Sequence, residues 1–394
     1  MWCDSLTISI CAAASDYSKL NVAMAETGLS LGYPVRASPV FVSLTTDLRY
    51  DMQGLLKQKI RKSVKLMEAR TSMIRPGDRV VIKVNLAVPA APEAAVGTHP
   101  ELVRAVVSVL KERHARIVLA EDCTDEAVQM SGIAGIAADT DVRFLNLRYR
   151  PYQDVARGPR TYSYALDVLR ADRLISMPKM KTHLYTYYTG AIKNMFGCIP
   201  RDERRDLHRE MATAAFSERL VDIFSIRRPD LVIMDGILAM EGVGPTQGKQ
   251  KAAGLLLISN DGVLLDYYGS ALMGYDPGQI AMINIAMRKN LHACPPESIL
   301  FSDCAQDAFR SQNWNRLPIL AGSQRKKALA ALFGPIRVQA DQCQTCGVCA
   351  GSCPFGAIAL RPYPQVTMEK CEYCFCCLEL CPRMALMPIR LHHA

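Results

Sequence analysis

Two cysteine runs near the end of the chain have the residue type and spacing of metal ligands. CQTCGVCAGSCP begins at Cys343 and CEYCFCCLELCP begins at Cys371, so one C-x2-C-x2-C-x3-C-P spacing recurs after 28 residues. In proteins with two four-iron clusters, three closely spaced thiolates of such a run bind one cluster and the fourth binds the other. The spacing therefore predicts two [4Fe-4S] clusters, with the ligand sets Cys343, Cys346, Cys349 and Cys381, and Cys371, Cys374, Cys377 and Cys353.

A pair of zinc sites is the alternative for these cysteines. Zinc ribbons use two separated C-x2-C pairs per metal, whereas each run places at least four cysteines within eleven residues, which favours clusters. Cys376 lies outside the spacing. We expect it to be an unligated small apolar residue, with a redox or alternate-ligand role as the alternative. The cysteines at positions 3, 11, 123, 198, 294 and 304 show no ligand spacing and are expected to be buried.

A row of cations follows a predicted strand in the middle of the chain. In RLISMPKMKTH the strand ends at Pro178, and Lys179, Lys181 and His183 follow at alternate positions. An extended segment places alternate side chains on one side, and open α/β sheets bind ligands beyond the carboxyl ends of their strands. The row is therefore a candidate catalytic site for an anion or a developing oxyanion, with Lys181 or His183 as proton donor. A solvated basic edge is the alternative.

Two further segments supply polar residues to the same predicted site. In TGAIKNMFG, Lys193 and Asn194 project side by side from a short turn between two glycines. In RVVIKVNL, Lys83 and Asn85 alternate within an aliphatic strand, where a lysine needs a partner. That partner is expected to be a ligand or a carboxylate such as Glu121, at the end of RIVLAE. A lysine that snorkels to solvent is the alternative.

The glycine-rich segment EGVGPTQGK follows the predicted strand DLVIMD. It lacks the G-K-[ST] ending of a phosphate-binding loop, and its glycine spacing differs from that of a dinucleotide fingerprint. We expect a tight turn that presents Glu241 and the backbone at Gly242 to the substrate. Asp266 opens a predicted amphipathic helix, where a role as N-cap and a role in the site are both open.

The surrounding elements must position these residues. From about residue 38 to 300, short aliphatic runs alternate with amphipathic stretches, as in a series of β-α-β units. The predicted strands are PVFVSL, RVVIKVNL, RIVLAE, RFLNL, RLISM, DLVIMD and GLLLIS. The predicted helices include residues 52–70 and 101–113, the latter with Thr98 as N-cap. The expected fold class is α/β, with a mostly parallel, helix-covered sheet, followed by a small α+β ferredoxin-like domain with two clusters.

Breaks in composition predict the domain limits. Residues 1–36 form an N-terminal extension, in which an apolar run without a preceding Lys or Arg indicates a strand and not a signal peptide. Residues 37–304 form the α/β domain. Residues 305–340 form a linker with a basic helix before a Gly-Pro break, and residues 341–394 form the cluster domain.

Composition narrows the function classes. The chain has 394 residues, of which 49% are apolar, and no apolar stretch approaches the ~18 residues of a membrane span. Metal-ligand spacing of the thiols is typical of reducing compartments, so we expect a cytoplasmic protein. The formal charge of +9 suits an anionic substrate or an acidic electron donor. With two Trp and ten Phe, the chain lacks the basic and aromatic interleaving of nucleic-acid-binding proteins.

Four segments resemble one known family. They are MPKMKTHLYTYYTGAIKNMFGCIP, GDRVVIKVNL, DGILAMEGVGPTQGK and SNDGVLLDYYGSALMG. Together with the adjacent Cys376 and Cys377 and with Glu379, they resemble the domain-of-unknown-function 362 family over roughly residues 38–390. Members of that family often carry a C-terminal pair of four-iron clusters. The resemblance therefore implies an iron–sulfur α/β protein and no particular substrate.

Two one-electron clusters beside a Lys- and His-lined pocket predict an oxidoreductase. It would pass electrons one at a time to a small anionic or carbonyl-conjugated substrate. The external electron donor would be a protein such as a ferredoxin or flavodoxin, and the sequence leaves room for a flavin and for any oligomeric state. Two alternatives stay open. One is an electron-transfer or docking protein for a partner oxidoreductase, and the other is a non-redox isomerase or lyase with structural clusters.

Anaerobically purified protein should contain about eight irons per chain and show a broad absorption shoulder near ~400 nm that dithionite bleaches. Cys374→Ser should lose or convert one cluster, whereas Cys376→Ser should retain both, because Cys376 lies outside the ligand spacing. Iron and sulfide analysis with absorption spectroscopy measures both effects. About four irons, or zinc in their place, would contradict the ligand assignment. Loss of a cluster in Cys376→Ser would contradict the pairing of the sulfurs.

Overall fold

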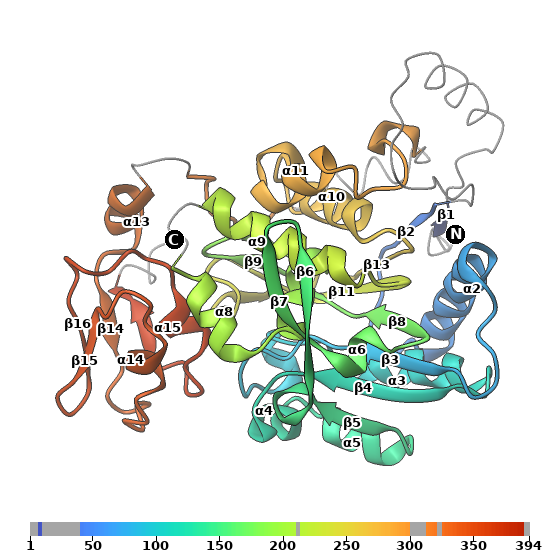
Figure 1. The fold of residues 1–394 in the computed structure, drawn as a ribbon, viewed down its shortest axis with the longest axis horizontal. Helices are drawn as coiled ribbons and strands as arrows, with labels where there is room; N and C mark the ends of the chain where they lie inside the picture. The colour runs from blue at the N-terminus through green and yellow to red at the C-terminus, as the bar shows by residue number, and fades with distance from the viewer. Residues whose placement is uncertain (1–6, 10–39, 210–212, 300–312, 321–324, 390–394) are drawn as a thin grey trace.

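The structure is a computed structural model that describes residues 7–9, 40–209, 213–299, 313–320 and 325–389. It contains an eleven-stranded sheet with helices on both faces, beside a small C-terminal unit (Figure 1). The strands of the sheet are β1 (Thr7–Ser9), β2 (Val42–Thr45), β3 (Arg79–Lys83), β4 (Arg116–Glu121), β5 (Arg143–Asn146), β8 (Arg173–Ser176), β9 (Lys179–His183), β10 (Tyr187–Thr189), β11 (Leu231–Glu241), β12 (Lys249–Lys251) and β13 (Leu255–Ser259). All seven predicted strands lie in this sheet. Apart from β1, the predicted N-terminal extension lies outside the described residues.

Five neighbouring strands of the sheet run parallel. Their order is β11-β8-β3-β4-β5, which confirms the prediction of a largely parallel α/β sheet. β13 pairs antiparallel with β11, and β2 and β1 extend that side of the sheet. Because the carboxyl ends of parallel strands meet at one edge, the residues that follow β3, β4 and β8 lie close together.

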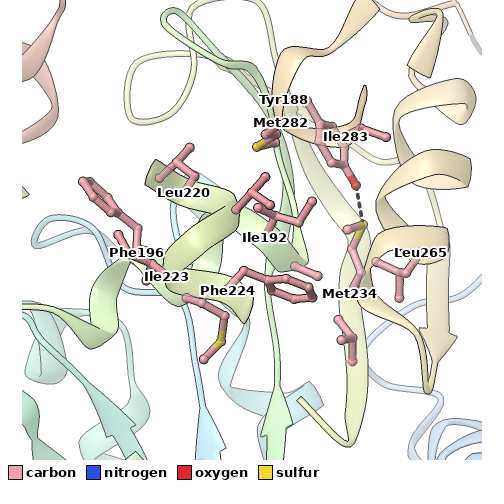
Figure 2. Packing of buried hydrophobic residues seen from close by; sticks show 14 of the residues in the cluster. Tyr188, Ile192, Phe196, Leu220, Ile223, Phe224, Met234, Leu265, Met282 and Ile283 are labelled. Atoms are coloured by element: carbon pink, nitrogen blue, oxygen red, sulfur yellow. Dashed lines mark hydrogen bonds between the residues drawn. The ribbon is translucent and has the colours of Figure 1, made fainter. Parts of the chain in front are cut away.

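Helices cover both faces of the sheet. They are α2 (Gln53–Thr71), α3 (Pro100–Lys111), α4 (Asp125–Met130), α5 (Ile133–Asp139), α6 (Leu166–Leu169), α7 (Ala191–Asn194), α8 (Arg201–Leu207), α9 (Thr213–Ile226), α10 (Gly262–Leu272) and α11 (Ala281–Arg288). Val80 and Ile82 of β3 pack with α2 and α3, whereas Val81 belongs to the core under α9, α10 and α11. This alternation is the period of two that a strand buried on both faces requires. Figure 2 shows the core under α9, α10 and α11, where Phe224 of α9 lies near Met234 of β11.

The N-cap of α3 is His99, one residue after the predicted Thr98. His99 is the N-cap, because its Nδ1 accepts the backbone N–H of Glu101 at 3.2 Å, so the prediction of Thr98 as N-cap is wrong. The Thr98 hydroxyl instead accepts the N–H of Asn85 at 2.9 Å and donates to the carbonyl of Met177 at 2.6 Å. Thr98 therefore ties the segment after β3 to the segment after β8.

The C-terminal unit contains two small sheets and short helices. β14 (Ile336–Val338) pairs with β17 (Leu386–Pro388), β15 (Ile358–Leu360) pairs with β16 (Pro364–Val366), and the helices are α13 (Arg325–Phe333), α14 (Val348–Ser352) and α15 (Cys376–Glu379). α13 is the basic helix predicted for the linker. The buried Arg325 guanidinium of α13 donates to the carbonyls of Leu184 (3.5 Å) and Tyr373 (3.4 Å), which joins the unit to the sheet domain. No helix in the described ranges is both long and apolar enough to span a bilayer.

The backbone of the C-terminal unit repeats with the period of its cysteines. Thr345 and Gly347 have φ angles of +52° and +75°, and the equivalent residues Tyr373 and Phe375 have φ angles of +51° and +59°. A left-handed conformation is uncommon for residues other than glycine. The two cysteine loops therefore share one unusual backbone shape.

β9 follows β8 after Pro178 and carries the predicted cationic row. It pairs parallel with β11, with Lys179 opposite Asp235 and Lys181 opposite Met240, and the register shifts between these pairs. Lys179 is fully buried, and its Nζ lies 2.9 Å from Asp235 Oδ2 and 3.2 Å from Tyr50 Oη. The Lys179–Asp235 ion pair thus joins two strands inside the protein, where each charge depends on the other.

Lys179→Met should leave the Asp235 carboxylate buried without its cation. The free energy of unfolding should fall by about 3–5 kcal/mol, because the remaining charge loses the partner that offsets its desolvation. Thermal and urea unfolding measure this loss. The control is Arg61→Met, which breaks an exposed ion pair with Glu112 and should leave the midpoint near that of the wild type. Equal midpoints for the two variants would contradict a structural role for Lys179.

Candidate functional site

A pocket lies at the carboxyl edge of the parallel strands, where the C-terminal unit closes it. Its empty space is about 1000 Å³, including the part open to solvent. The walls come from the ends of β3 and β4, from β9, α7 and α8, and from Glu379 of α15 with Leu380 and Pro382. Figure 1 shows the C-terminal unit beside α8 at this side of the sheet. The sheet domain and the second cysteine run therefore share the pocket.

Six of the predicted site residues line this pocket, although they come from three separate segments. They are Lys83, Asn85, Lys181, His183, Lys193 and Asn194. The segments meet because β3 and β9 lead to the same edge of the sheet and α7 follows β10, the antiparallel partner of β9. The fold thus brings together side chains that the sequence could only assign to one site by analogy with other α/β sheets.

Three other predicted site residues do not line this pocket. Lys179 is occupied by its ion pair within the sheet. Glu241 ends β11, and its Oε2 accepts the backbone N–H of Asn315 at 3.0 Å. The carbonyl of Gly242 accepts the hydroxyl of Thr182 at 2.8 Å. The Glu241 carboxylate and the Gly242 carbonyl are thus engaged by Asn315 and Thr182, neither of which lines the pocket.

Lys83 has the carboxylate partner that the sequence predicts. Its Nζ lies 2.7 Å from Glu121 Oε2 and donates to the carbonyl of Val84 at 2.9 Å. Both charged side chains are buried. Gly197 packs directly against this pair, since a Cβ at that position would lie 2.6 Å from Glu121 Oε1. The chain after α7 therefore approaches the ion pair as closely as only a glycine permits.

Lys181 is buried without a carboxylate within ion-pair distance among the described residues. Its Nζ donates to the backbone carbonyl of Val96 at 2.6 Å, and the side chain lines the pocket. Burial lowers the pKa of Lys181 to about 7, and the charge of Glu379 opposes this shift. At neutral pH both protonation forms are populated, which is the condition for a general acid or base.

The His183 ring lies beside a carboxylate of the C-terminal unit. Its Nδ1 accepts the backbone N–H groups of Tyr185 (3.1 Å) and Thr186 (3.3 Å), which places the ring proton of the neutral imidazole on Nε2. Nε2 lies 3.1 Å from Glu379 Oε1. Burial alone would raise the pKa of Glu379, but the neighbouring imidazole and the Lys193 ammonium outweigh burial and hold this pKa below its usual range. Glu379 is therefore an ionised carboxylate in the pocket wall.

Asp266 positions the turn that carries Lys193. Its carboxylate accepts the first two backbone N–H groups of α7, at 2.6 and 2.9 Å. Asp266 lies inside α10, whose own N-cap is Asp261, so its capping role acts across space on another helix. The Lys193 ammonium lies 4.6 Å from the ring centroid of Phe196, a cation–π contact that holds the charge at the pocket wall.

Asn194 leaves one polar atom for a ligand. Its Nδ2 donates to Ser176 Oγ at 2.9 Å, which fixes the amide. Its Oδ1 is buried and has no hydrogen-bond partner within the described part of the chain. Buried polar atoms of folded proteins are almost always paired, so an orphaned acceptor in a pocket wall indicates a hydrogen bond to a bound molecule.

Four arginines and one histidine that line the pocket were not predicted from the sequence. They are Arg148, Arg201, Arg204, Arg205 and His208. The last four belong to the charged segment PRDERRDLHRE, whose place directly after TGAIKNMFGCI was the available signal. No sequence signal pointed to Arg148. Burial lowers the pKa of His208 to about 4, so its imidazole is neutral at physiological pH.

A second cavity lies inside the C-terminal unit and holds about 360 Å³ including its opening. Its lining contains Cys353, Cys371, Cys374 and Cys377, the four cysteines that the spacing assigns to one cluster. The fully buried Cys376 does not line it. In the described ranges, no three His, Cys, Asp or Glu side chains converge on a single-ion site. A four-iron cube takes its thiols from around a wider space than a single ion does, so the cluster assignment stays a prediction from the spacing.

The other predicted ligand set is closer to solvent. Cys346 is exposed, Cys343 is half-buried, and Cys349 and Cys381 are buried. The backbone N–H of Ala385 donates to Cys381 Sγ at 3.3 Å. Backbone N–H groups that point at cysteine sulfur are the contacts through which proteins adjust cluster potentials.

Residues 80–271 match the family described as "Domain of unknown function (DUF362)". A thylakoid-associated protein of Synechocystis is 28% identical over 262 residues, which are 65% of this chain and 81% of that protein. A crystal structure of a Thermotoga maritima protein aligns at 11% identity and a TM-score of 0.35, over 60% of this chain and 59% of that one, and a likeness of this degree supports no argument. The predicted resemblance is thus confirmed over residues 80–271, and the cysteine runs lie outside the family match.

The amine of Lys181 should become reactive at an unusually low pH. Because burial lowers its pKa to about 7, the nucleophilic unprotonated form should appear as the pH rises through that value. Competitive acetylation over a pH series, followed by peptide mass spectrometry, measures the midpoint. The exposed Lys65 in the same digest is the control. A Lys181 midpoint near the ~10.4 that is ordinary for lysine would contradict the effect of burial.

Proposed function

We propose that this chain is an iron–sulfur oxidoreductase that reduces a small anionic or carbonyl-conjugated molecule in the pocket between the sheet domain and the C-terminal unit. The proposal rests on a pocket that is lined by both the sheet domain and the second cysteine run. Lys181 and His183 of the sheet domain line the same pocket as Glu379, which lies between Cys377 and Cys381 in the second cysteine run. An electron carrier held by that run would therefore adjoin the pocket.

The cysteines of the two runs would hold the clusters, which supply single electrons when bound. Reduction of a carbonyl-conjugated double bond consumes two electrons and two protons, and negative charge develops on the carbonyl oxygen. The ammonium groups of Lys181 and Lys193 would stabilise that charge in a site with little water. Lys181 would donate one proton, since its pKa of about 7 leaves it partly protonated at neutral pH, and solvent would supply the other.

Glu379 keeps this proton donor functional. Burial by itself would drive the pKa of Lys181 lower still, and the negative charge of Glu379 opposes that effect. His183 lies beside this carboxylate, with its Nε2 3.1 Å from Glu379 Oε1. The C-terminal unit would therefore contribute to proton transfer as well as to electron supply.

The two ligand sets would have different roles. Cys346 of the first run is exposed, whereas Cys374 and Cys376 of the second run pack into the core beneath the sheet domain. An external donor such as a ferredoxin or flavodoxin would reach the set that contains Cys346. The set that contains Cys374 would serve the substrate.

The pocket is the observation that favours an enzyme over a docking protein, because docking needs no buried ammonium beside a neutral imidazole. A non-redox isomerase or lyase would use the same pocket but would turn over at the same rate with oxidised and reduced clusters. The cysteine usage supports a cytoplasmic location. The thylakoid association of the Synechocystis relative makes peripheral attachment to a membrane the alternative.

Lys181→Ala and His183→Ala should lower turnover by on the order of 10²-fold, the usual scale for loss of one electrostatic or proton-donating group. Cluster absorption and reduction by dithionite should not change. The measurement is single-turnover reoxidation of the reduced protein by the substrate identified in extracts of the purified chain. Lys181→Arg should rescue the rate only in part, because a guanidinium retains its proton.

The pH dependence gives a second test of the same role. A proton donor is lost above its pKa, so the wild-type rate should fall as the pH rises through about 7. This limb should be absent from Lys181→Ala. Unchanged reoxidation in both alanine variants would contradict a catalytic role for the row and would favour the docking protein.

A further inference from the structure

Arginines from two separate elements meet at the pocket. Arg148 comes from the 3-10 helix Leu147–Tyr149, and Arg201, Arg204 and Arg205 come from α8. Their long side chains carry planar forks of N–H donors, the geometry that matches a carboxylate or a phosphate. Neither the cysteine runs nor the Lys181 row accounts for this second group of cations.

The protein neutralises these arginines unequally. Asp122 accepts from Arg204 and, at 3.4 Å, from Arg148, so one carboxylate serves two guanidinium groups. Arg204 Nε is buried and remains without a partner in the described residues. Arg201 forms no hydrogen bond or ion pair with any described residue, although it lies half-buried in the wall. Positive charge at this part of the pocket therefore exceeds what the described residues neutralise.

The lining as a whole has the same imbalance. It contains seven Lys and Arg residues against three Asp and Glu residues, a formal surplus of four positive charges. Buried side-chain atoms that point to a ligand accompany the surplus. Thr189 Oγ1 and His208 Nδ1 line the pocket, are at least nine-tenths buried with their residues, and have no hydrogen-bond partner among the described residues. Such atoms cost free energy unless a bound molecule pairs with them.

We propose that Arg201, with Arg148 and Arg204, binds a carboxylate or phosphate group of the substrate at a position that takes no part in the reduction. This inference rests on the proposed function and specifies its substrate class: a molecule with a compact terminal oxyanion in addition to the group that is reduced. The guanidinium group would hold one end, and Lys181, His183 and Lys193 would act on the other. Binding energy from a remote anion would then position the reacting group.

The geometry assigns Arg201 the largest contribution to binding of the anionic group. Arg204 and Arg148 are held by Asp122, which orients them but also reduces their net charge. No described residue accepts a hydrogen bond from Arg201 or forms an ion pair with it, so its guanidinium donors are available for a ligand. A charge-assisted hydrogen bond to an anion is worth more than one between neutral groups, and a bidentate one adds specificity. Loss of Arg201 should thus weaken anion binding without disturbing the contacts that fold the pocket.

The test is anion binding by the purified full-length protein, with inorganic phosphate and acetate as separate probes. Each is titrated against the thermal unfolding midpoint and by calorimetry, with sodium chloride at equal ionic strength as the reference. We expect at least one probe to bind, and Arg201→Gln to weaken its binding by about tenfold or more. Arg201→Lys should bind more weakly than wild type, because an ammonium cannot form the bidentate contact. A stronger response to phosphate indicates a phosphate monoester as substrate, and a stronger response to acetate indicates a carboxylic acid.

Arg209→Gln is the matched control, since it removes the same charge from an exposed residue just after α8, outside the pocket lining. It should bind both probes as the wild type does. Equal binding by Arg201→Gln and Arg209→Gln, or no binding of either probe beyond the chloride effect, would overturn the proposal. So would a shift of cluster absorption or reduction in Arg201→Gln with anion binding intact, because Arg201 would then neutralise the cluster. The binding assay needs no electron transfer. It therefore tests the anion site even if the protein proves not to be a reductase.

Discussion

Three lysine ammonium groups are buried at one edge of the sheet, and the site depends on how each of them is neutralised. A charge removed from water must be paired or must give up its proton. Lys83 is paired with Glu121 and Lys179 with Asp235, so both serve the structure of the sheet. Lys181 donates to a backbone carbonyl and has no carboxylate at ion-pair distance among the described residues, and burial brings its pKa to about 7. The same physical constraint thus separates two ion-paired lysines from one whose pKa lies near neutrality.

The pocket around Lys181 exists only because two parts of the chain are packed together. The sheet domain supplies its base and one side, while Glu379, Leu380 and Pro382 of the second cysteine run close the other side. Arg325 of α13 holds this arrangement through carbonyl groups on both parts. An unpaired carboxylate at Glu379 would be costly in this position, and the cations of the sheet domain remove that cost. The electrostatics of one unit are therefore incomplete without the other.

Small residues and buried caps maintain the close approach of these elements. Gly197 lets the chain after α7 rest on the Lys83–Glu121 pair, where any side chain would collide with a carboxylate oxygen. Asp266 caps α7 from inside α10 and so fixes the turn that carries Lys193. These contacts fix the positions of the lining residues. Electrostatic stabilisation of a developing charge requires groups that are held in place in this way.

Local patterns in the sequence determined the strands, the largely parallel sheet and the two cysteine repeats. Each of these depends on spacing within a few residues, either the period of two of a strand or the spacing of thiols in one loop. Only the tertiary structure decided which of the alternating cations line the pocket, that Glu241 lies outside it, and that α8 contributes arginines to it. Those outcomes depend on partners far apart in the chain, such as Asp235 for Lys179 and Glu379 for His183. Strand register and domain packing determine which side chains are buried and which distant segments they pair with. Burial and pairing then set the charge state of a side chain, whatever its neighbours in sequence are.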